Sequence, residues 1–250
     1  MSAAFKDHFS TEARSYAAFR PHYPPELFTY LARLAPARER AWDPATGNGQ
    51  AAWGLAGHFR EVLASDASIR QVTAREPADG VRFWVARAEA GALPARSVDL
   101  ILVAQALHWL DHEAFWPEVR RVARDGAVVV ASYYTLCRVA PEIDRWIDGD
   151  YREKMDAYWP PERRLLDAEY RTIPFPFPEI ETPGFELVAD WTRADLLGYL
   201  GTWSSTARYR RAVGRDPLPD LDARLAPLWP AGERRRVRWP LGLRAGVVRG

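Results

Sequence analysis

The chain is 250 residues long, 48% hydrophobic and 27% charged, which is typical of a globular protein with a substantial core. Its 34 basic and 33 acidic residues leave a formal net charge of +1, which disfavours a dedicated nucleic-acid or anionic-membrane binder. A single cysteine, Cys137, excludes an intramolecular disulfide, and no apolar run approaches the roughly 18 residues that span a bilayer. We therefore expect a single domain over residues 1–250, in the cytoplasm and without a metal site.

Residues 1–35 are predicted to form an N-terminal helical cap, because a Pro-Pro pair opens residues 24–34 and leucines follow at near-helical spacing. Between residues 40 and 135, short apolar runs alternate with amphipathic stretches, which is typical of strand-helix-strand units with a parallel sheet. The expected strands are 40–43, 61–66, 81–86, 98–103 and 127–133, and the expected crossover helices are 49–59 and 113–123.

The pattern changes in residues 141–183, where aromatic residues among charges precede an alternation of proline with apolar residues. This favours a helical insertion followed by an extended segment. Residues 185–250 are expected to contain a strand over 185–191, a helix over 193–210 and a last strand over 234–248 that Pro240 and Gly242 interrupt. The pattern predicts a Rossmann-like, doubly wound α/β fold with seven strands, mostly parallel, and an antiparallel last strand.

A glycine turn follows the first predicted strand, in the segment AWDPATGNGQ. The strand ends at Asp43, and Gly47 and Gly49 permit the positive φ angles that let backbone N–H groups at a helix start approach an anionic group. Asp66 ends the second strand about 20 residues further on, the spacing of a carboxylate that accepts hydrogen bonds from ribose hydroxyls. The loop and the acid together predict a ligand that contains a nucleoside.

The same loop fits the dinucleotide fingerprint GxGxxA through Gly47, Gly49 and Ala52, so a nicotinamide-dependent oxidoreductase is an alternative. Asp43 argues against it, because a carboxylate beside the loop repels a pyrophosphate and attracts an ammonium group. The two lysines, Lys6 and Lys154, lie away from the predicted strand ends, so a tyrosine-lysine proton relay is also missing. A nucleoside that carries an amino acid fits these charges best.

Four segments occur in order along most of the chain: SYAAFRPHYP, DPATGNGQ, AEAGALPARSVDLILVAQALHWLD and RVRWPLGLRAGVVR. Together they resemble the class I S-adenosylmethionine-dependent methyltransferases, and specifically the trans-aconitate methyltransferase-like proteins of the small-molecule branch. DPATGNGQ is similar to the first methyltransferase motif, with Ala45 in place of its usual first glycine. The resemblance implies a methyltransferase that uses S-adenosylmethionine, and a catalytically silent nucleoside-binding partner protein is a further alternative.

The resemblance also implies a cofactor site at the carboxyl ends of the parallel strands. The glycine loop would hold the methionyl part with help from Asp43 at its amino group, Asp66 would hold the ribose, and Ala88 and Glu89 would flank the adenine. The predicted cofactor residues are Tyr16, Arg20, Asp43, Ala45, Thr46, Gly47, Asn48, Gly49, Asp66, Ala67, Ala88, Glu89, Gln105 and Ala106.

The chemistry of the acceptor decides which side chains take part. Methyl transfer from a sulfonium is a direct displacement that needs alignment and exclusion of water. A carboxylate acceptor is ionised near pH 7, and Arg20, with Arg208 or Arg210, would then position it without a base. A hydroxyl or amine acceptor would need His108 as the catalytic general base.

The second half of the chain is rich in aromatic residues, which are predicted to form an apolar lid over a small substrate. The predicted acceptor contacts are Trp109, Tyr133, Trp203 and Arg208. The expected partner is a small-molecule methyl acceptor, with neither nucleic acid nor membrane, and the expected state is a monomer or a homodimer.

Overall fold

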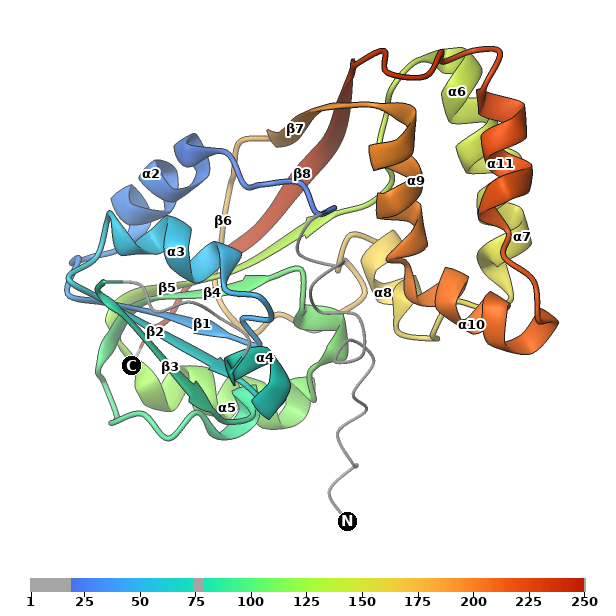
Figure 1. Cartoon of the computed structure of the whole chain (residues 1–250). Helices are drawn as coiled ribbons and strands as arrows, with labels where there is room; N and C mark the ends of the chain where they lie inside the picture. The colour runs from blue at the N-terminus through green and yellow to red at the C-terminus, as the bar shows by residue number, and fades with distance from the viewer. Residues whose placement is uncertain (1–18, 74–78, 250) are drawn as a thin grey trace.

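The structure is a computed structural model that describes residues 19–73 and 79–249. Within these residues, one sheet of eight strands runs through the molecule in the order β3-β2-β1-β4-β5-β8, with β6 and β7 on the outer edge of β8 (Figure 1). The strands are β1 (Arg40–Pro44), β2 (Glu61–Asp66), β3 (Val81–Val85), β4 (Val98–Ala104), β5 (Ala123–Tyr134), β6 (Glu179–Ile180), β7 (Phe185–Trp191) and β8 (Arg235–Val247).

Strands β1 to β5 are parallel, and β8 runs antiparallel to β5. The short β6 pairs with the end of β8, and β7 pairs with its beginning, so the two follow one another along a single edge. The eight strands therefore occupy seven positions. This confirms the predicted seven-stranded, mostly parallel, Rossmann-like sheet with an antiparallel last strand.

Helices cover both faces of the sheet, with α2 and α3 above it and α5 below it in the view of Figure 1. Apolar residues of β5 alternate between the two faces, as a strand requires. Val128 and Val130 join the core that contains Leu27 of α2, whereas Val129 joins the core that contains Phe115 of α5. The helices of this part are α2 (Pro25–Leu34), α3 (Gln50–Ala56), α4 (Ile69–Thr73) and α5 (His112–Val122), with 3-10 turns at Ala88–Ala90 and Leu107–Trp109.

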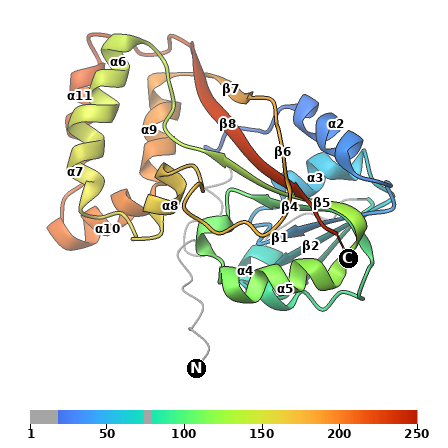
Figure 2. The same ribbon diagram turned by 180° about the vertical axis from the view of Figure 1, so that it is seen from behind.

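A second group of helices, which we call the helical lobe, stands beside the sheet (Figures 1 and 2). It contains α6 (Pro141–Arg145), a π-helical turn (Trp146–Tyr151), α7 (Arg152–Asp156), α9 (Arg193–Gly201), α10 (Ser204–Val213) and α11 (Leu218–Leu225). The lobe thus combines the predicted insertion with helices from the C-terminal part of the chain. Helix α8 (Arg163–Asp167) lies between the lobe and the sheet.

The single helix predicted over residues 193–210 is wrong, because the chain breaks between α9 and α10. The hydroxyl of Thr202 donates to the carbonyl of Tyr199 at 2.6 Å and ends α9, and Trp203 is extended at ψ 137° before α10 begins. The turn lets α10 pack against both α9 and α7. Helix α11 was not predicted.

The interruption predicted at Pro240 and Gly242 is also wrong, because β8 continues through both residues. The backbone N–H and C=O of Arg238 bond Arg138, on the side of β8 that faces β5. Backbone groups two residues apart on a strand point to the same side, so those of Pro240 also face β5. The last residue of β8 that pairs with β5 is Leu241, so Pro240 lies just outside this pairing. The missing N–H of Pro240 therefore leaves no ladder bond unmade. A Cβ at Gly242 would lie 2.2 Å from the ring of Tyr133, so this glycine makes room for an aromatic side chain.

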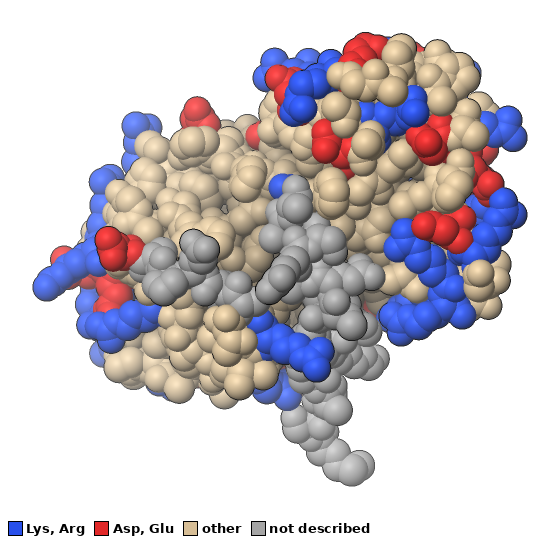
Figure 3. Space-filling model, in the orientation of Figure 1, with Lys and Arg blue, Asp and Glu red and all other residues tan. Residues whose placement is uncertain are grey.

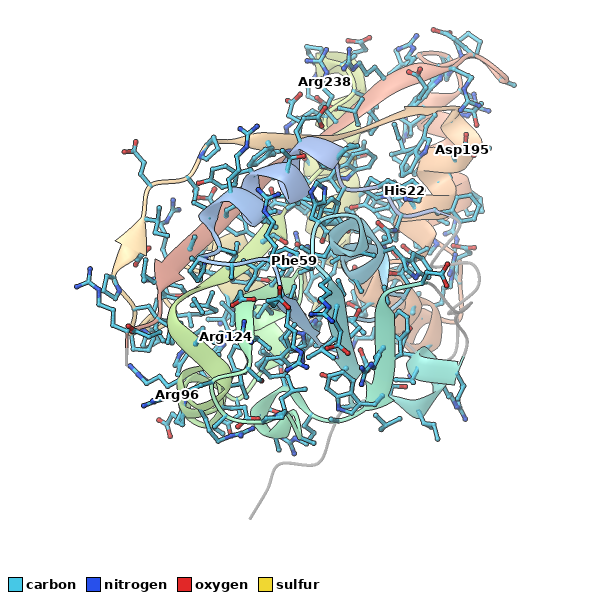
Figure 4. The ribbon with its side chains drawn as sticks, turned by 90° about the vertical axis from the view of Figure 1, so that its left-hand side faces the viewer. His22, Phe59, Arg96, Arg124, Asp195 and Arg238 are labelled. Atoms are coloured by element: carbon cyan, nitrogen blue, oxygen red, sulfur yellow. The ribbon has the colours of Figure 1, made fainter. Side chains whose placement is uncertain are left out.

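The carboxylate of Asp99 connects several segments at the amino ends of the strands, on the side of the sheet opposite the carboxyl ends. Asp99 at the start of β4 accepts hydrogen bonds from the backbone N–H groups of Glu39 and Arg40 at 3.0 and 2.9 Å. The guanidinium of Arg124 donates to the same carboxylate at 2.8 Å. Figure 4 places Arg96 and Arg124 on the side of the sheet away from the helix that carries Asp195. No helix of the described residues is long and apolar enough to cross a bilayer.

Candidate active site

A cavity of about 620 Å³ lies between the carboxyl ends of β1 to β5 and the helical lobe. Loops that follow the strands line one part of it, and residues from 159–166 and from the α9–α10 junction line another. A volume of this size is typical of small-molecule sites. The predicted residues that line it are Arg20, Ala45, Thr46, Gly47, Asn48, Asp66, Ala67, Ala88, Glu89, Gln105, Ala106, His108, Trp109 and Trp203.

The loop after β1 contains three residues with left-handed backbone conformations. Ala45, Gly47 and Gly49 have φ angles of 55°, 53° and 88°. Glycine adopts such angles without strain, whereas Ala45 adopts them at a steric cost. The N–H of Thr46 donates to the carbonyl of Ser65 at 3.0 Å, so the loop is attached to the end of β2. The fold holds this loop in an unusual conformation beside the cavity.

Asp66 connects the same loop to the end of β2. One carboxylate oxygen accepts the N–H of Gly47 at 2.9 Å, and the other accepts the N–H of Ser68 at 2.8 Å. A carboxylate has about four acceptor positions, so two bonds leave capacity for hydroxyl groups of a ligand. Asp66 is only 8% exposed and lines the cavity. It can therefore organise the loop and accept hydrogen bonds from a ribose.

Asp43 and Gly49 do not line the cavity. Asp43 is fully buried, and the hydroxyl of Thr46 donates to its carboxylate at 2.5 Å. Gly49 is the N-cap residue of α3. The predicted contact of Asp43 with a cofactor amino group is therefore not direct in this structure, where its carboxylate bonds the loop through Thr46.

Ala88 and Glu89 lie in the 3-10 turn after β3, on the cavity wall. The carboxylate of Glu89 accepts the backbone N–H of Asp111 at 3.0 Å and the Nε of Arg87 at 3.2 Å. These bonds hold the turn against the start of α5. The wall predicted to flank an adenine is thus rigidly attached to two neighbouring segments.

Gln105 extends the pairing of β4 with β5 by means of its side chain. It has a φ angle of 54°, its amide donates to the carbonyl of Tyr134 at 2.9 Å, and its side-chain oxygen accepts the N–H of Tyr134 at 2.8 Å. The hydroxyl of Tyr134 in turn accepts a hydrogen bond from Arg20 at 3.3 Å, and the guanidinium lies 5.2 Å from the ring centre of Tyr199. Gln105 therefore positions Tyr134 and, through it, Arg20 on the cavity wall.

Two predicted acceptor contacts lie away from the cavity. Successive residues of a strand face opposite sides, so Tyr134 lines the cavity while Tyr133 packs edge-on against Tyr170 at 5.4 Å. Arg208 lies half-buried on α10 and does not line the cavity either. Tyr16 lies outside the described residues.

His108 is buried against Tyr170, with 2.9 Å between Nδ1 and the phenol oxygen. Burial, followed by the positive charge of Arg163 and the electrostatic influence of His112, lowers the pKa of His108 to about 3. Burial also raises the pKa of the Tyr170 phenol well above its usual range. A neutral imidazole with so low a pKa is a weak base at pH 7. The low pKa and the contact with Tyr170 favour a hydrogen-bonding role over proton removal.

Aromatic residues of the second half of the chain close the cavity on the lobe side. The ring of Trp203 lies 5.2 Å from Trp159 and 5.9 Å from Tyr199, and all three line the cavity. Arg163 of α8 lines it as well. The sequence indicated an aromatic lid but not Tyr134, Tyr199 or Arg163, because their approach depends on how the lobe packs. In the described part of the chain, no three His, Cys, Asp or Glu side chains gather as a metal site would require.

Comparison with known proteins agrees with this geometry. Residues 42–131 match a family model described as a methyltransferase domain. A candidate methyltransferase of Dictyostelium discoideum is 33% identical over 221 residues, which cover 87% of this chain and 84% of that protein. The solved structure of a candidate type II methyltransferase from Anaeromyxobacter dehalogenans is 44% identical, covers 92% of this chain and 98% of its own, and superposes with a TM-score of 0.87.

A more distant structure shares the fold alone. Phosphoethanolamine N-methyltransferase 2 of Haemonchus contortus is 15% identical with a TM-score of 0.51, over all of this chain and 61% of that one. The strand order, the loop after β1 and the cavity define an α/β protein of the Rossmann-like class. With its relatives, the chain belongs to the class I S-adenosylmethionine-dependent methyltransferase family. Membership favours this interpretation over the nicotinamide-dependent alternative, and the trans-aconitate methyltransferase-like branch stays a prediction.

Proposed function

We propose that the protein transfers a methyl group from S-adenosylmethionine to a small molecule that binds in the same cavity. The observation that carries this proposal is the cavity itself, which the glycine loop and Asp66 line on the core side and an aromatic group lines on the lobe side. A cavity that two different walls enclose suits two ligands held next to one another. Residues 40–135 would bind the cofactor, and residues 141–183 would contribute to the acceptor side.

The core side of the cavity fits the cofactor in several respects. Asp66 has acceptor capacity for the ribose hydroxyls, and Ala88 and Glu89 lie on the wall beyond it. Gly47 and Asn48 bring the backbone to the cavity surface. The Haemonchus contortus enzyme that shares this fold was solved in complex with S-adenosyl-L-methionine, which supports the same cofactor here.

When bound, S-adenosylmethionine supplies an electrophilic methyl carbon, so the protein mainly has to align the acceptor and exclude water. The rings of Trp159, Tyr199 and Trp203 provide an apolar wall for this purpose. A carboxylate acceptor needs no base, whereas a hydroxyl acceptor would have to lose its proton. Because His108 is a weak base, we favour a carboxylate over a hydroxyl as the nucleophile.

The charge distribution supports a small acceptor rather than a nucleic acid. On the face that Figure 3 shows, the Lys and Arg side chains stand in separate groups near the edges, with uncharged surface between them. A nucleic-acid substrate calls for a continuous basic surface. A monomer or a homodimer is the state we propose.

Calorimetric titration tests the cofactor assignment. We expect S-adenosylmethionine and S-adenosylhomocysteine to bind with micromolar dissociation constants and NAD not to bind. Asp66→Ala is expected to weaken S-adenosylhomocysteine by roughly 1.5 to 3 kcal/mol, about ten- to more than hundredfold, because charge-assisted hydrogen bonds are lost. Asp156→Ala, at an exposed position of α7, is the matched control.

Asp66 also holds Gly47 and Ser68, so thermal melts of the variant must accompany the titration. Unchanged affinity in a folded Asp66→Ala protein would refute the role of this residue. A folded wild-type protein that binds NAD, or neither cofactor form, would refute the proposed function. Release of S-adenosylhomocysteine on incubation with small carboxylates would separate an active enzyme from a silent nucleoside-binding protein.

A further inference from the structure

Arg163 of α8 is held firmly at the cavity wall. Its Nε donates to Oδ1 of Asp167, one helical turn later, at 2.8 Å. Its guanidinium carbon lies 4.4 Å from the ring centre of Trp159, which is a stacking distance. The side chain is only 13% exposed. A long, flexible side chain is therefore fixed in one position by a carboxylate on one side and an indole on the other.

The two terminal nitrogens of Arg163 retain their hydrogen-bonding capacity. A guanidinium has five N–H donors, of which the Nε donor is used by Asp167. Among residues 19–73 and 79–249, no group accepts a hydrogen bond from Nη1 or Nη2. A nearly buried cation that lines a cavity with open donors is well suited to an anionic group with two oxygens.

Carboxylates surround Arg163, but the ion pair with Asp167 uses only the Nε side of its guanidinium. Asp66, Glu89, Asp111 and Glu162 also line the cavity. Two of these carboxylates have other partners, because Glu89 bonds Arg87 and Asp111 caps α5 through the N–H of Ala114. His108 lies near enough to Arg163 for the guanidinium charge to act on its pKa, and its imidazole stays neutral.

Arg163 lies next to an apolar surface of the cavity. Trp159, on which it stacks, also contacts Trp203, and Trp203 contacts Tyr199. Arg163 thus stands at one end of a continuous aromatic wall inside the cavity, whereas Arg20, at the Tyr199 end, already donates to the hydroxyl of Tyr134. A ligand that matches this arrangement has a flat apolar body with an anionic group at one end.

We propose that Arg163, oriented by Asp167 and Trp159, binds an anionic group of the methyl acceptor, a carboxylate or a phosphate, while the aromatic wall holds the acceptor's apolar body. Arg163 would then determine specificity for acidic acceptors. This inference rests on the proposed function, because it treats the lobe side of the cavity as the acceptor site.

Titration of the full-length protein, saturated with S-adenosylhomocysteine, with benzoate, phenyl phosphate and benzamide tests this assignment. Benzoate and benzamide have the same ring, but only benzoate is charged. Phenyl phosphate has a phosphate in place of the carboxylate, so comparison with benzoate shows which of the two anionic groups the site prefers. We expect at least one of the two anions to bind about tenfold or more tightly than benzamide. Arg163→Gln is expected to weaken that anion about 10- to 100-fold and to leave both benzamide and S-adenosylhomocysteine unchanged.

Arg164→Gln is the matched control, since this arginine is the next residue of the same helix and is exposed. Equal affinity of wild type and Arg163→Gln for both anions, or anions that bind no better than benzamide at millimolar concentration, would overturn the inference. Arg163→Lys keeps the charge without the planar fork and should give an intermediate loss if the glutamine variant fails to fold. Failure of S-adenosylhomocysteine to bind wild type would instead refute the proposed function, and the anions would then be titrated into the protein alone.

Discussion

Ala45 illustrates how a single residue changes the energy of the loop after β1. Its φ angle of 55° costs an L-residue roughly 1 to 2 kcal/mol, which glycine avoids, although glycine loses more entropy on folding. We therefore expect Ala45→Gly to raise the free energy of unfolding by about 0.5 to 1 kcal/mol in urea. Ala223→Gly, at an exposed position inside α11, should lower it by a similar amount. An Ala45→Gly protein that is less stable than wild type would contradict the inferred backbone strain at Ala45.

The buried imidazole of His108 should make stability depend on pH. Its folded pKa, about 3, lies below its unfolded value near 6.5, so the unfolded chain binds more protons between these values. The contribution is fully present above pH 6.5 and is lost as the pH falls toward 3, by about 2 kcal/mol at pH 5. Urea unfolding at pH 7.5 and pH 5 should show this loss in wild type and a smaller one in His108→Asn. Identical pH dependence in the two proteins would show that the pKa is not depressed.

At the scale of elements, the contact between β5 and β8 depends on Gly242. A Cβ there would lie 2.2 to 2.5 Å from atoms of the Tyr133 ring, so Gly242→Ala should lower the free energy of unfolding by about 1 to 3 kcal/mol. Tyr133→Leu removes the ring, and in that background the same substitution should cost less. Chemical denaturation of the four proteins of this double-mutant cycle gives the coupling energy.

Gly57→Ala provides the control for this element, since a Cβ there meets no atom within 4 Å and the φ angle of −75° suits alanine. Additive effects of Gly242→Ala and Tyr133→Leu would mean that the ring is not what the glycine accommodates.

At the scale of the whole molecule, the strand ends of the sheet and the helical lobe share one cavity. Ligands that stabilise the native state slow local opening where they bind. In hydrogen exchange measured by mass spectrometry, S-adenosylhomocysteine should protect residues 45–49, 66–68 and 88–89. Further addition of the anion that binds more tightly, benzoate or phenyl phosphate, should protect residues 159–166 and 199–204. Protection confined to other segments, such as the amino ends of the strands near Asp99, would contradict the placement of both ligands.

Much of the fold could be predicted from local sequence pattern. The alternation of apolar strands with amphipathic helices between residues 40 and 135 gave β1 to β5, α3 and α5 close to their observed bounds. The glycine loop and Asp66 could be identified together, because their roles depend on the ends of neighbouring parallel strands, which always meet at one edge of the sheet. These features follow from periodicity and backbone geometry, which are encoded within a few residues.

The lobe side of the cavity could be predicted only in outline. Aromatic composition indicated a lid. Two features of the lobe depend instead on contacts between distant segments: the break at Thr202 and Trp203, and the packing of α9, α10 and α11 in one lobe with α6 and α7. Tyr134 rather than Tyr133 lines the cavity, because successive side chains of a strand point to opposite faces of the sheet. An error of one residue in the predicted strand therefore exchanges the two tyrosines.

The sequence by itself determined the class of sheet, the loop after β1 and the acidic residue beside it. Only the tertiary structure decided that Arg163 faces the cavity, that Asp43 lies beneath the loop and that His108 is a buried, weakly basic imidazole. The physical reason is that local pattern specifies which residues form an element, whereas burial, charge environment and access to a ligand are properties of the packed whole.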